Sequence, residues 1–387
     1  MPHIYRRAFR LFLPLLLLLA MAACSREQAA PTEPIRLALI VQLTGEYTDI
    51  GAVTRDAAAL ACQRINDRGG VQTRAGKRPL ELVVIDKGPS VEGGLEALRR
   101  AVFQEHAVLV IGGVLSRNAI PMARVAEELG VPFISPGSTH PETTRGKRFV
   151  WRIPFTDAFQ GRILAKFARK DLQSRRAAVL YDSASEYNRF LAESFRQAYA
   201  GMGGTITAYE PYVTGDSSWG PQLTRIAQSK PDVLFLPNYH DEVPLQAHQA
   251  RAMGVTATLL GGDGWEMLSG PGLEPMDNSF YSSTWAPQME SPESREFVAA
   301  YEAAYKRTPV TTACLGYDAV LLAAAALTKV AEVNPAAVRQ GLFEVETLEG
   351  AGGVYHYRSG GDPEKSAAIL RIAEGRAVFY KEITAGE

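Results

Sequence analysis

The sequence predicts an α/β protein of two lobes, each a doubly wound parallel sheet, joined by a hinge of three chain crossings. From residue 35, short β-branched runs alternate with amphipathic segments of helical length, which is typical of a parallel sheet with helices on both faces. The same rhythm begins again after "RFVWRIPFTDAFQG", residues 148–161. The chain has 387 residues, more than one hydrophobic core usually holds.

The first lobe is predicted to begin with four strands and three intervening helices. Each strand candidate is a short apolar run, and each helix candidate has apolar residues at a helical period. The strands are expected within residues 35–45, 80–88, 107–116 and 131–139, and the helices within residues 53–70, 90–106 and 118–130.

The second lobe repeats this pattern, and the chain ends in β-like runs. Helices are expected within residues 159–172, 188–204, 218–230 and 243–254, and strands within residues 177–183, 205–213, 232–239, 256–264, 354–358 and 366–383.

A long helical run at residues 312–331 resumes the style of the first lobe after the second lobe's last strand. The lobes are therefore expected to be discontinuous in sequence, with crossings near Ile153, Trp285 and Asp362. Two lobes joined in this way would leave a cleft between them. This division assigns residues 35–153 and 286–362 to lobe 1 and residues 154–285 and 363–383 to lobe 2.

The N-terminal segment has the pattern of an export signal. Arg6, Arg7 and Arg10 precede a leucine run that ends on the small residues Ala22 and Ala23. The run is too short for a convincing membrane span, which needs about 20 apolar residues. Residues 1–23 are therefore predicted to be a signal peptide.

The signal ends in "MAAC", which resembles the lipobox of bacterial lipoproteins, although Met21 stands where Leu is usual. By this resemblance, cleavage leaves Cys24 as a diacylated N-terminus on the outer side of a membrane, at the periplasm or cell surface. The alternative is an ordinary signal peptide with an incidental cysteine. Residues 24–34 read as a flexible polar tether, which favours the lipid anchor.

The composition argues against a nucleic-acid partner. Without residues 1–23 the chain carries 38 basic and 42 acidic residues, a net charge of −4, so no basic face is implied. Cys62 and Cys314 remain, and both lie in apolar helical patterns. Two buried free thiols are expected rather than a disulfide, although an exported protein could form one.

No motif points to catalysis, a cofactor or a metal. The sequence lacks a phosphate-binding loop, G-x-G-x-x-G, C-x-x-C and a G-x-S-x-G elbow. "GDSS" superficially suggests a hydrolase serine, but Asp216 and Ser217 precede a helix and are expected to cap it. His240 and His248 are eight residues apart, twice the spacing that places two ligands on adjacent turns of a helix.

Five predicted strands share one feature: polar residues at or just beyond their carboxyl ends. In open parallel sheets ligands bind outside these ends, so two facing lobes would collect the polar groups around one cavity. Each residue alone has an ordinary explanation, since Ser116 could cap a helix and Asp263 could be a turn carboxylate. The residues are Ser116, Ser138 with Thr139, Tyr187, Tyr239 and Asp263.

Seven stretches of the sequence, quoted at the end of this paragraph, resemble those of a known protein family. The chain from about residue 35 to 383 resembles the Leu/Ile/Val-binding family of periplasmic substrate-binding proteins, the receptors of branched-chain amino acid ABC transporters, which have the periplasmic binding protein type I-like fold. The order and spacing match over nearly the whole mature chain. The matching stretches are "TGEYTDIGAVTRDAAALACQRINDRGGV", "VIGGVLSRNAIP", "ISPGSTHPETT", "VWRIPFTDAFQG", "YDSASEYNRFL", "PDVLFLPNYHDE" and "LLGGDGW".

The resemblance implies roles for individual residues. Ser116 falls where the family binds the ligand carboxylate, and the Gly137 carbonyl and Thr139 fall where the amino acid head group is held. Asp263 falls where a carboxylate takes the ammonium. Tyr187 and Tyr239 fall where aromatic residues of the second lobe cover the ligand.

The chain also departs from the family pattern. Ile50 stands where some members have an aromatic residue, and Arg117 follows the anchor serine, so both are candidate specificity residues, although Arg117 could simply face solvent. The expected function is capture of a small amino acid by hinge closure and its delivery to an ABC permease and ATPase. The alternatives are a sensor on the same fold, a binder of an amide or aromatic acid, and a hydrolase using "GDSS" or the Asp263 region.

Overall fold

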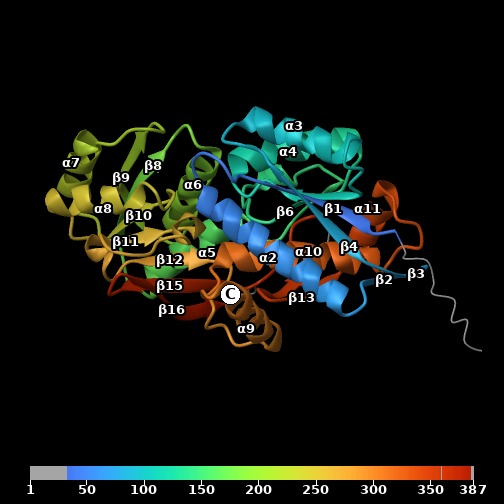
Figure 1. Cartoon of the computed structure of the whole chain (residues 1–387). Helices are drawn as coiled ribbons and strands as arrows, with labels where there is room; N and C mark the ends of the chain where they lie inside the picture. The colour runs from blue at the N-terminus through green and yellow to red at the C-terminus, as the bar shows by residue number, and fades with distance from the viewer. Residues whose placement is uncertain (1–32, 359, 385–387) are drawn as a thin grey trace, which may run out of the picture. The chain divides into compact units, whose positions relative to one another are not determined.

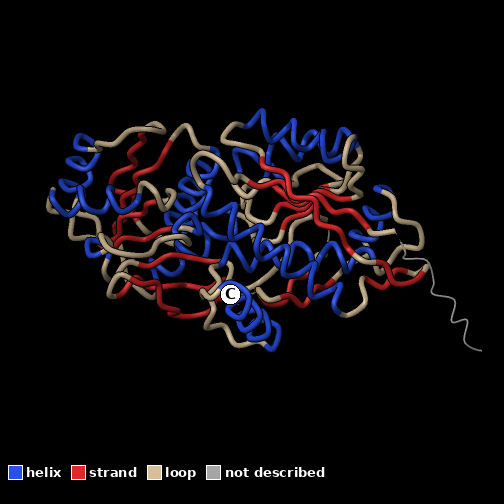
Figure 2. Tube along the Cα trace, viewed as in Figure 1, coloured by secondary structure: helices blue, strands red, loops and turns tan. Residues whose placement is uncertain are grey.

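The computed structural model describes residues 33–358 and 360–384. These residues form two main sheets with helices on both faces, which confirms the predicted fold class (Figure 1, Figure 2). Among the described helices none has the length and apolar character needed to span a membrane. The predicted signal peptide and Cys24 lie outside the described residues.

The first main sheet is entirely parallel and has the strand order β4-β1-β5-β6-β7. Its strand β1 is apolar on both sides. Leu37, Leu39 and Val41 enter one core cluster, and Ala38 and Ile40 enter the other. This two-sided burial is expected of a strand inside a doubly wound sheet. The strands are β1 (Ile35–Val41), β4 (Leu80–Asp86), β5 (Leu109–Gly112), β6 (Phe133–Ser135) and β7 (Val150–Arg152).

Helices cover both faces of this sheet (Figure 1). One core cluster contains residues of α2, α9, α10 and α11, and the other contains residues of α3 and α4. Cys62 on α2 and Cys314 on α10 are buried free thiols, as predicted. The helices are α2 (Thr48–Asp67), α3 (Val91–Phe103), α4 (Ser116–Leu129), α9 (Pro292–Tyr305), α10 (Thr311–Leu327) and α11 (Pro335–Phe343).

The second main sheet has the order β16-β15-β12-β11-β10-β8-β9. Its first five strands along the chain pair in parallel, whereas β15 and β16 pair antiparallel. Only Glu374 and Gly375 separate β15 from β16, and so short a connection permits an antiparallel hairpin but no parallel crossover. The strands are β8 (Arg176–Asp182), β9 (Thr205–Tyr212), β10 (Val233–Leu236), β11 (Thr258–Gly261), β12 (Phe280–Ser283), β15 (Ala367–Ala373) and β16 (Arg376–Ile383).

Two pairs of helices cover the second sheet. Residues of α5 and α6 belong to the core cluster on one face, and residues of α7 and α8 to the cluster on the other. These helices are α5 (Asp157–Lys170), α6 (Glu186–Gly201), α7 (Gly220–Ser229) and α8 (Val243–Ala252).

The remaining elements are small hairpins and single helical turns. The sequence reading missed the β2–β3 hairpin, whose strands have only three residues each and too little pattern to be recognised. They are β2 (Val71–Thr73), β3 (Gly76–Arg78), β13 (Thr347–Gly350), β14 (Gly353–His356), η1 (Pro141–Thr143), η2 (Asp263–Trp265) and η3 (Glu274–Met276).

The chain passes between the two sheets three times. It enters the second sheet between β7 and β8, and after β12 it returns to form α9, α10, α11 and the β13–β14 hairpin, which pack on the first core. It then rejoins the second sheet as β15. The residue limits of the two lobes stay a prediction.

Candidate ligand-binding site

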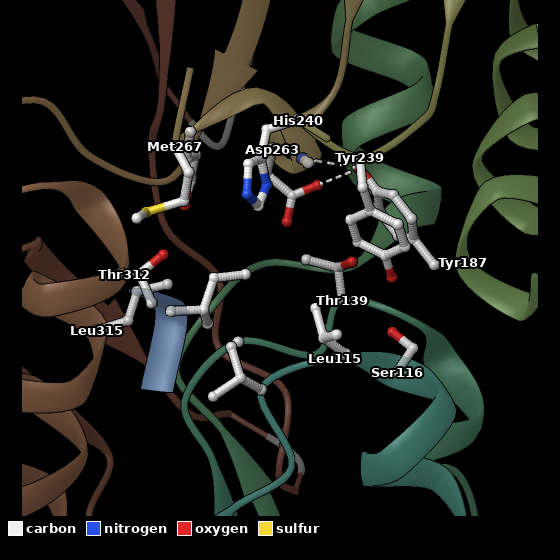
Figure 3. A pocket seen from close by; sticks show the side chains of 15 residues that line it. Leu115, Ser116, Thr139, Tyr187, Tyr239, His240, Asp263, Met267, Thr312 and Leu315 are labelled. Carbon is white, nitrogen blue, oxygen red and sulfur yellow. Dashed lines mark hydrogen bonds between the residues drawn. The ribbon is translucent and has the colours of Figure 1, made fainter. Parts of the chain in front are cut away.

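One cavity gathers most of the residues that the sequence singled out (Figure 3). The empty space between its walls, including the part open to solvent, is about 500 Å³. Its walls combine loops that follow strands of both sheets with the first turns of α2, α4, α6 and α10. The cavity is lined by Ile50, Val114, Leu115, Ser116, Gly137, Thr139, Tyr187, Tyr239, His240, Asp263, Gly264, Glu266, Met267, Thr312 and Leu315.

Ser116 and Thr139 bring hydroxyl groups to the first-sheet side of the cavity. Ser116 is the first residue of α4, whereas Leu115 occupies the N-cap and makes no side-chain capping bond. Ser116 is therefore not a capping residue. Thr139 belongs to the loop that follows β6, where the chain approaches the segment between β5 and α4 so closely that a Cβ on Gly137 would lie 2.6 Å from Val114 Cγ1. A larger residue than glycine would push this loop away from Ser116.

Ser138 supports the site without lining it. Its side chain is buried, and its hydroxyl lies 2.9 Å from Ser116 Oγ and 2.7 Å from Thr143 Oγ1. Its backbone N–H donates to Ser135 Oγ at 3.1 Å. This network orients the Ser116 hydroxyl, so Ser138 is a positioning residue and not a wall of the cavity.

Asp263 and two tyrosines form the second-sheet side. Asp263 lies in η2, directly after β11, and its Oδ1 accepts hydrogen bonds from Tyr187 Oη at 2.7 Å and Gln160 Nε2 at 2.8 Å. The rings of Tyr187 and Tyr239 stack with centroids 5.1 Å apart. Burial raises the pKa of the Asp263 carboxyl, and the hydrogen bonds from Tyr187 and Gln160 oppose this shift.

Of the two candidate specificity residues, only one lines the cavity. Ile50 lies in the first turn of α2, which begins earlier than predicted, and its side chain lines the cavity. Arg117 does not line the cavity. Its guanidinium carbon lies 5.0 Å from the centroid of the Tyr47 ring, where the cation is attracted by the aromatic face.

Contacts across the cavity mouth join the two halves of the molecule. Tyr47 precedes α2 on the first-sheet side and donates a hydrogen bond from its hydroxyl to Asp241 Oδ2 at 2.7 Å. Asp49 Oδ2 lies 3.4 Å from His240 Nε2. The Tyr47 ring meets the Tyr239 ring edge-on, with centroids 6.1 Å apart. These contacts close the cavity on the side where Tyr239 and His240 line it.

Sequence reasoning missed Asp157, the first residue of α5. Its side chain is fully buried, and the Thr139 hydroxyl is the side-chain group close enough to lower its carboxyl pKa by hydrogen bonding. Burial, and next the charge of Asp263, raise the pKa of the Asp157 carboxyl well above its usual value. An acidic residue after a threonine N-cap reads as an ordinary helix start, and here Thr156 does accept the capping bond from Phe159 N.

The reasoning also missed His240, Glu266, Met267, Thr312 and Leu315, which line the cavity. The polar strand end at Asp263 was recognised, but Glu266 three residues later was not. Thr312 and Leu315 lie in an apolar helical run that reads as core. Their exposure to the cavity depends on how α10 packs, which periodicity does not reveal.

The "GDSS" segment has no place in this cavity. The predicted capping of α7 is wrong: its N-cap is Trp219, without a side-chain capping bond. Asp216 instead closes a turn by accepting from Val213 N at 3.1 Å, because it lies too far before the helix to reach its first amides. Within the described residues no group of three or more His, Cys, Asp or Glu side chains is arranged to hold a metal.

Two α/β halves joined by three crossings, with a polar cavity at their strand ends, define a binding protein that encloses a small ligand. The family model described as periplasmic binding protein matches residues 34–377. The chain belongs to this family, and the relatives it resembles include Leu/Ile/Val-binding proteins and substrate-binding proteins of branched-chain amino acid transporters.

Known relatives agree over nearly the whole chain. The Leu/Ile/Val-binding protein BraC3 of Rhizobium johnstonii is 29% identical over 354 residues, which cover 89% of this chain and 93% of that protein. The branched-chain amino acid substrate-binding protein LivJ of Streptococcus pneumoniae, solved with isoleucine, is 26% identical with a TM-score of 0.82, covering 91% and 99% of the two chains.

A more distant structure shares the fold alone. The solute-binding protein of an ABC transporter from R. palustris, solved with benzoate, is 19% identical with a TM-score of 0.78, and the match covers 90% of this chain and 96% of that one. The fold therefore does not determine the ligand.

Proposed function

We propose that this protein is an extracytoplasmic lipoprotein that captures a small amino acid, branched-chain or related, and delivers it to an ABC permease and ATPase. One observation carries the proposal: Ser116 and Thr139 face the same cavity as Asp263. A site for an anion and a site for a cation within one small cavity fit a zwitterion. The ligands named for BraC3 and LivJ support this class.

The carboxylate is held at the start of α4. There it meets the Ser116 hydroxyl, the Thr139 hydroxyl and the positive end of a 14-residue helix. Backbone N–H groups at a helix start and the helix dipole both favour an anion without a full positive charge. Nearby, the Gly137 carbonyl is an acceptor for the head group.

Asp263 holds the ammonium. A second buried carboxyl, that of Asp157, lies beside Thr139. Asp157 N donates to Thr139 O at 2.9 Å, which places the two residues side by side. An ammonium near Asp263 would offset the burial that raises its carboxyl pKa and would keep the carboxylate ionised. A plain carboxylic acid or amide would leave this charge unpaired, at a cost in binding.

Binding occurs by closure of the two lobes, residues 35–153 with 286–362 and residues 154–285 with 363–383. Tyr187 and Tyr239 cover the ligand from the second lobe, while the Tyr47–Asp241 hydrogen bond closes the mouth. The proposed role of the cavity is to hold a ligand, so neither catalysis nor a cofactor is part of the proposal.

A thermal-shift screen of the refolded, ligand-free protein tests this function. Small α-amino acids are expected to raise the melting temperature by several degrees at millimolar concentration, because a ligand that binds only the folded state stabilises it by mass action. Amides and aromatic acids serve as comparison ligands. A shift with an aromatic acid and none with any amino acid would contradict the proposal.

The lipid anchor has its own test in Cys24→Ala. Without the thiol no diacylglyceryl group can be attached, so the protein is expected to move from the membrane fraction to the soluble extracytoplasmic fraction. Ser25→Ala is the matched control and should stay membrane-bound. Equal membrane retention of Cys24→Ala would exclude lipidation at this residue.

A further inference from the structure

The cavity has a second end, away from the head-group residues. Met267, Thr312 and Leu315 lie together there, opposite Tyr187 and Ser116 (Figure 3). A ligand anchored by its head group at one end would direct its side chain toward the other. This end is not purely apolar, because Glu266 and Thr312 belong to its lining.

The Glu266 carboxyl is held beside the start of α10. Its Oε1 accepts a hydrogen bond from Ser283 Oγ at 2.8 Å, and Ser283 Oγ also lies 2.9 Å from Thr311 Oγ1. Thr312 is the next residue on α10, and Leu315 lies one turn further. Glu266 therefore occupies the same end of the cavity as Thr312 and Leu315.

The Glu266 carboxyl lies among both acidic and compensating groups: the Ser283 hydroxyl and the Thr284 backbone hydrogen-bond to it, and the charge of Lys365 opposes that of Asp263. No ion pair within 4 Å among the described residues includes it, and Asp263 shares its cavity. The base that faces it is Lys365, which is buried and whose Nζ donates to the Thr284 carbonyl oxygen. Burial, and next the charge of Asp263, raise the pKa of the Glu266 carboxyl well above its usual value.

We propose that Glu266 is a specificity-determining residue that hydrogen-bonds the ligand's side chain, so that the site prefers a small α-amino acid with a side-chain O–H or N–H donor. This inference rests on the proposed function. A purely aliphatic side chain would cover the cavity-facing side of this half-buried carboxyl with methyl groups and add no donor to those of Ser283 and Thr284, which is costly where the ligand excludes water. A hydroxyl or amide would satisfy it.

Two near-isosteric ligand pairs test the proposal by calorimetry: threonine against valine, and asparagine against leucine. Wild-type protein is expected to bind the polar member of at least one pair about tenfold more tightly. Glu266→Leu, which keeps the bulk and removes the acceptor, is expected to lose this preference. Glu266→Gln keeps a hydrogen-bonding group of the same shape and is expected to retain most of it. Melting temperatures without ligand show that each variant is folded.

Tighter binding of valine and leucine than of their polar partners, or an unchanged preference in Glu266→Leu, would overturn the role of Glu266. Binding of none of the four ligands would overturn it as well. In that case the thermal-shift screen of further amino acids separates the role of Glu266 from the proposed function. A rise in melting temperature with another amino acid would contradict only the role of Glu266. No rise with any amino acid would contradict both.

Discussion

Replacing Asp263 by alanine is expected to lower the affinity for an amino acid by about 30-fold to several thousandfold. Removing one member of a desolvated, hydrogen-bonded charge pair costs about 2 to 5 kcal/mol of binding free energy. The Asp263 carboxyl accepts hydrogen bonds from Tyr187 and Gln160, so in the bound state it is held rigidly toward the ligand's ammonium.

The stability of the ligand-free variant separates a binding role from a structural one. Burial disfavours the charged Asp263 carboxyl, but alanine also leaves the Tyr187 and Gln160 donors without their acceptor, so the melting temperature of the free protein should change much less than the affinity. Tyr187→Phe is the matched control, because it keeps the stacked ring and removes only the hydroxyl that donates to Asp263. It should weaken binding much less. Undiminished affinity in Asp263→Ala would show that the ammonium is held elsewhere.

Replacing Arg152 by methionine is expected to destabilise the protein by about 3 kcal/mol and to weaken ligand binding with it. The Arg152 guanidinium is fully buried at the end of β7 and holds the loop that carries Thr139. Its Nη1 donates to Ser138 O at 2.8 Å and its Nη2 to His140 O at 2.9 Å. Methionine fills a similar volume but leaves these carbonyl groups without a donor.

Two further variants identify the cause of that loss. Arg152→Lys keeps the charge but not the planar fork, so it should recover only part of the stability. Asp362→Asn removes the charge that pairs with Arg152 Nε at 2.6 Å but leaves the carbonyl contacts in place. The Asp362 side chain is 46% exposed and the carbonyl acceptors remain, so this change should cost less than Arg152→Met. Denaturant unfolding followed by circular dichroism gives the free energies. An Arg152→Met variant as stable as the wild type would contradict the account.

Much of the fold could be predicted because each main element has its own local pattern. The apolar run of β1 and the alternation that follows it indicate a parallel sheet without any tertiary information. The β2–β3 hairpin could not be predicted in this way, since three-residue strands carry almost no periodicity.

Part of the site could be predicted because polar residues interrupt apolar strands at their ends, as at Ser116 and Asp263. Thr312 and Asp157 were not predicted because each is ordinary in its local setting. Thr312 lies at the start of an apolar helix, and Asp157 follows a threonine N-cap. Only the packing of distant elements brings them to the cavity or beside it. The role of Arg152 was not predicted either, because its hydrogen-bond partners lie in two separate loops that only the packing of the chain brings together.

Recognition of both ends of a zwitterion is the central claim, and calorimetry on the refolded, ligand-free protein tests it most directly. The amino acid that gives the largest thermal shift is compared with two analogues, one lacking the amine and one lacking the carboxylate. Each analogue leaves one end of the site empty, so each is expected to bind at least about 30-fold more weakly. Binding of the carboxylic acid without its amine as tightly as the parent amino acid would contradict the claim.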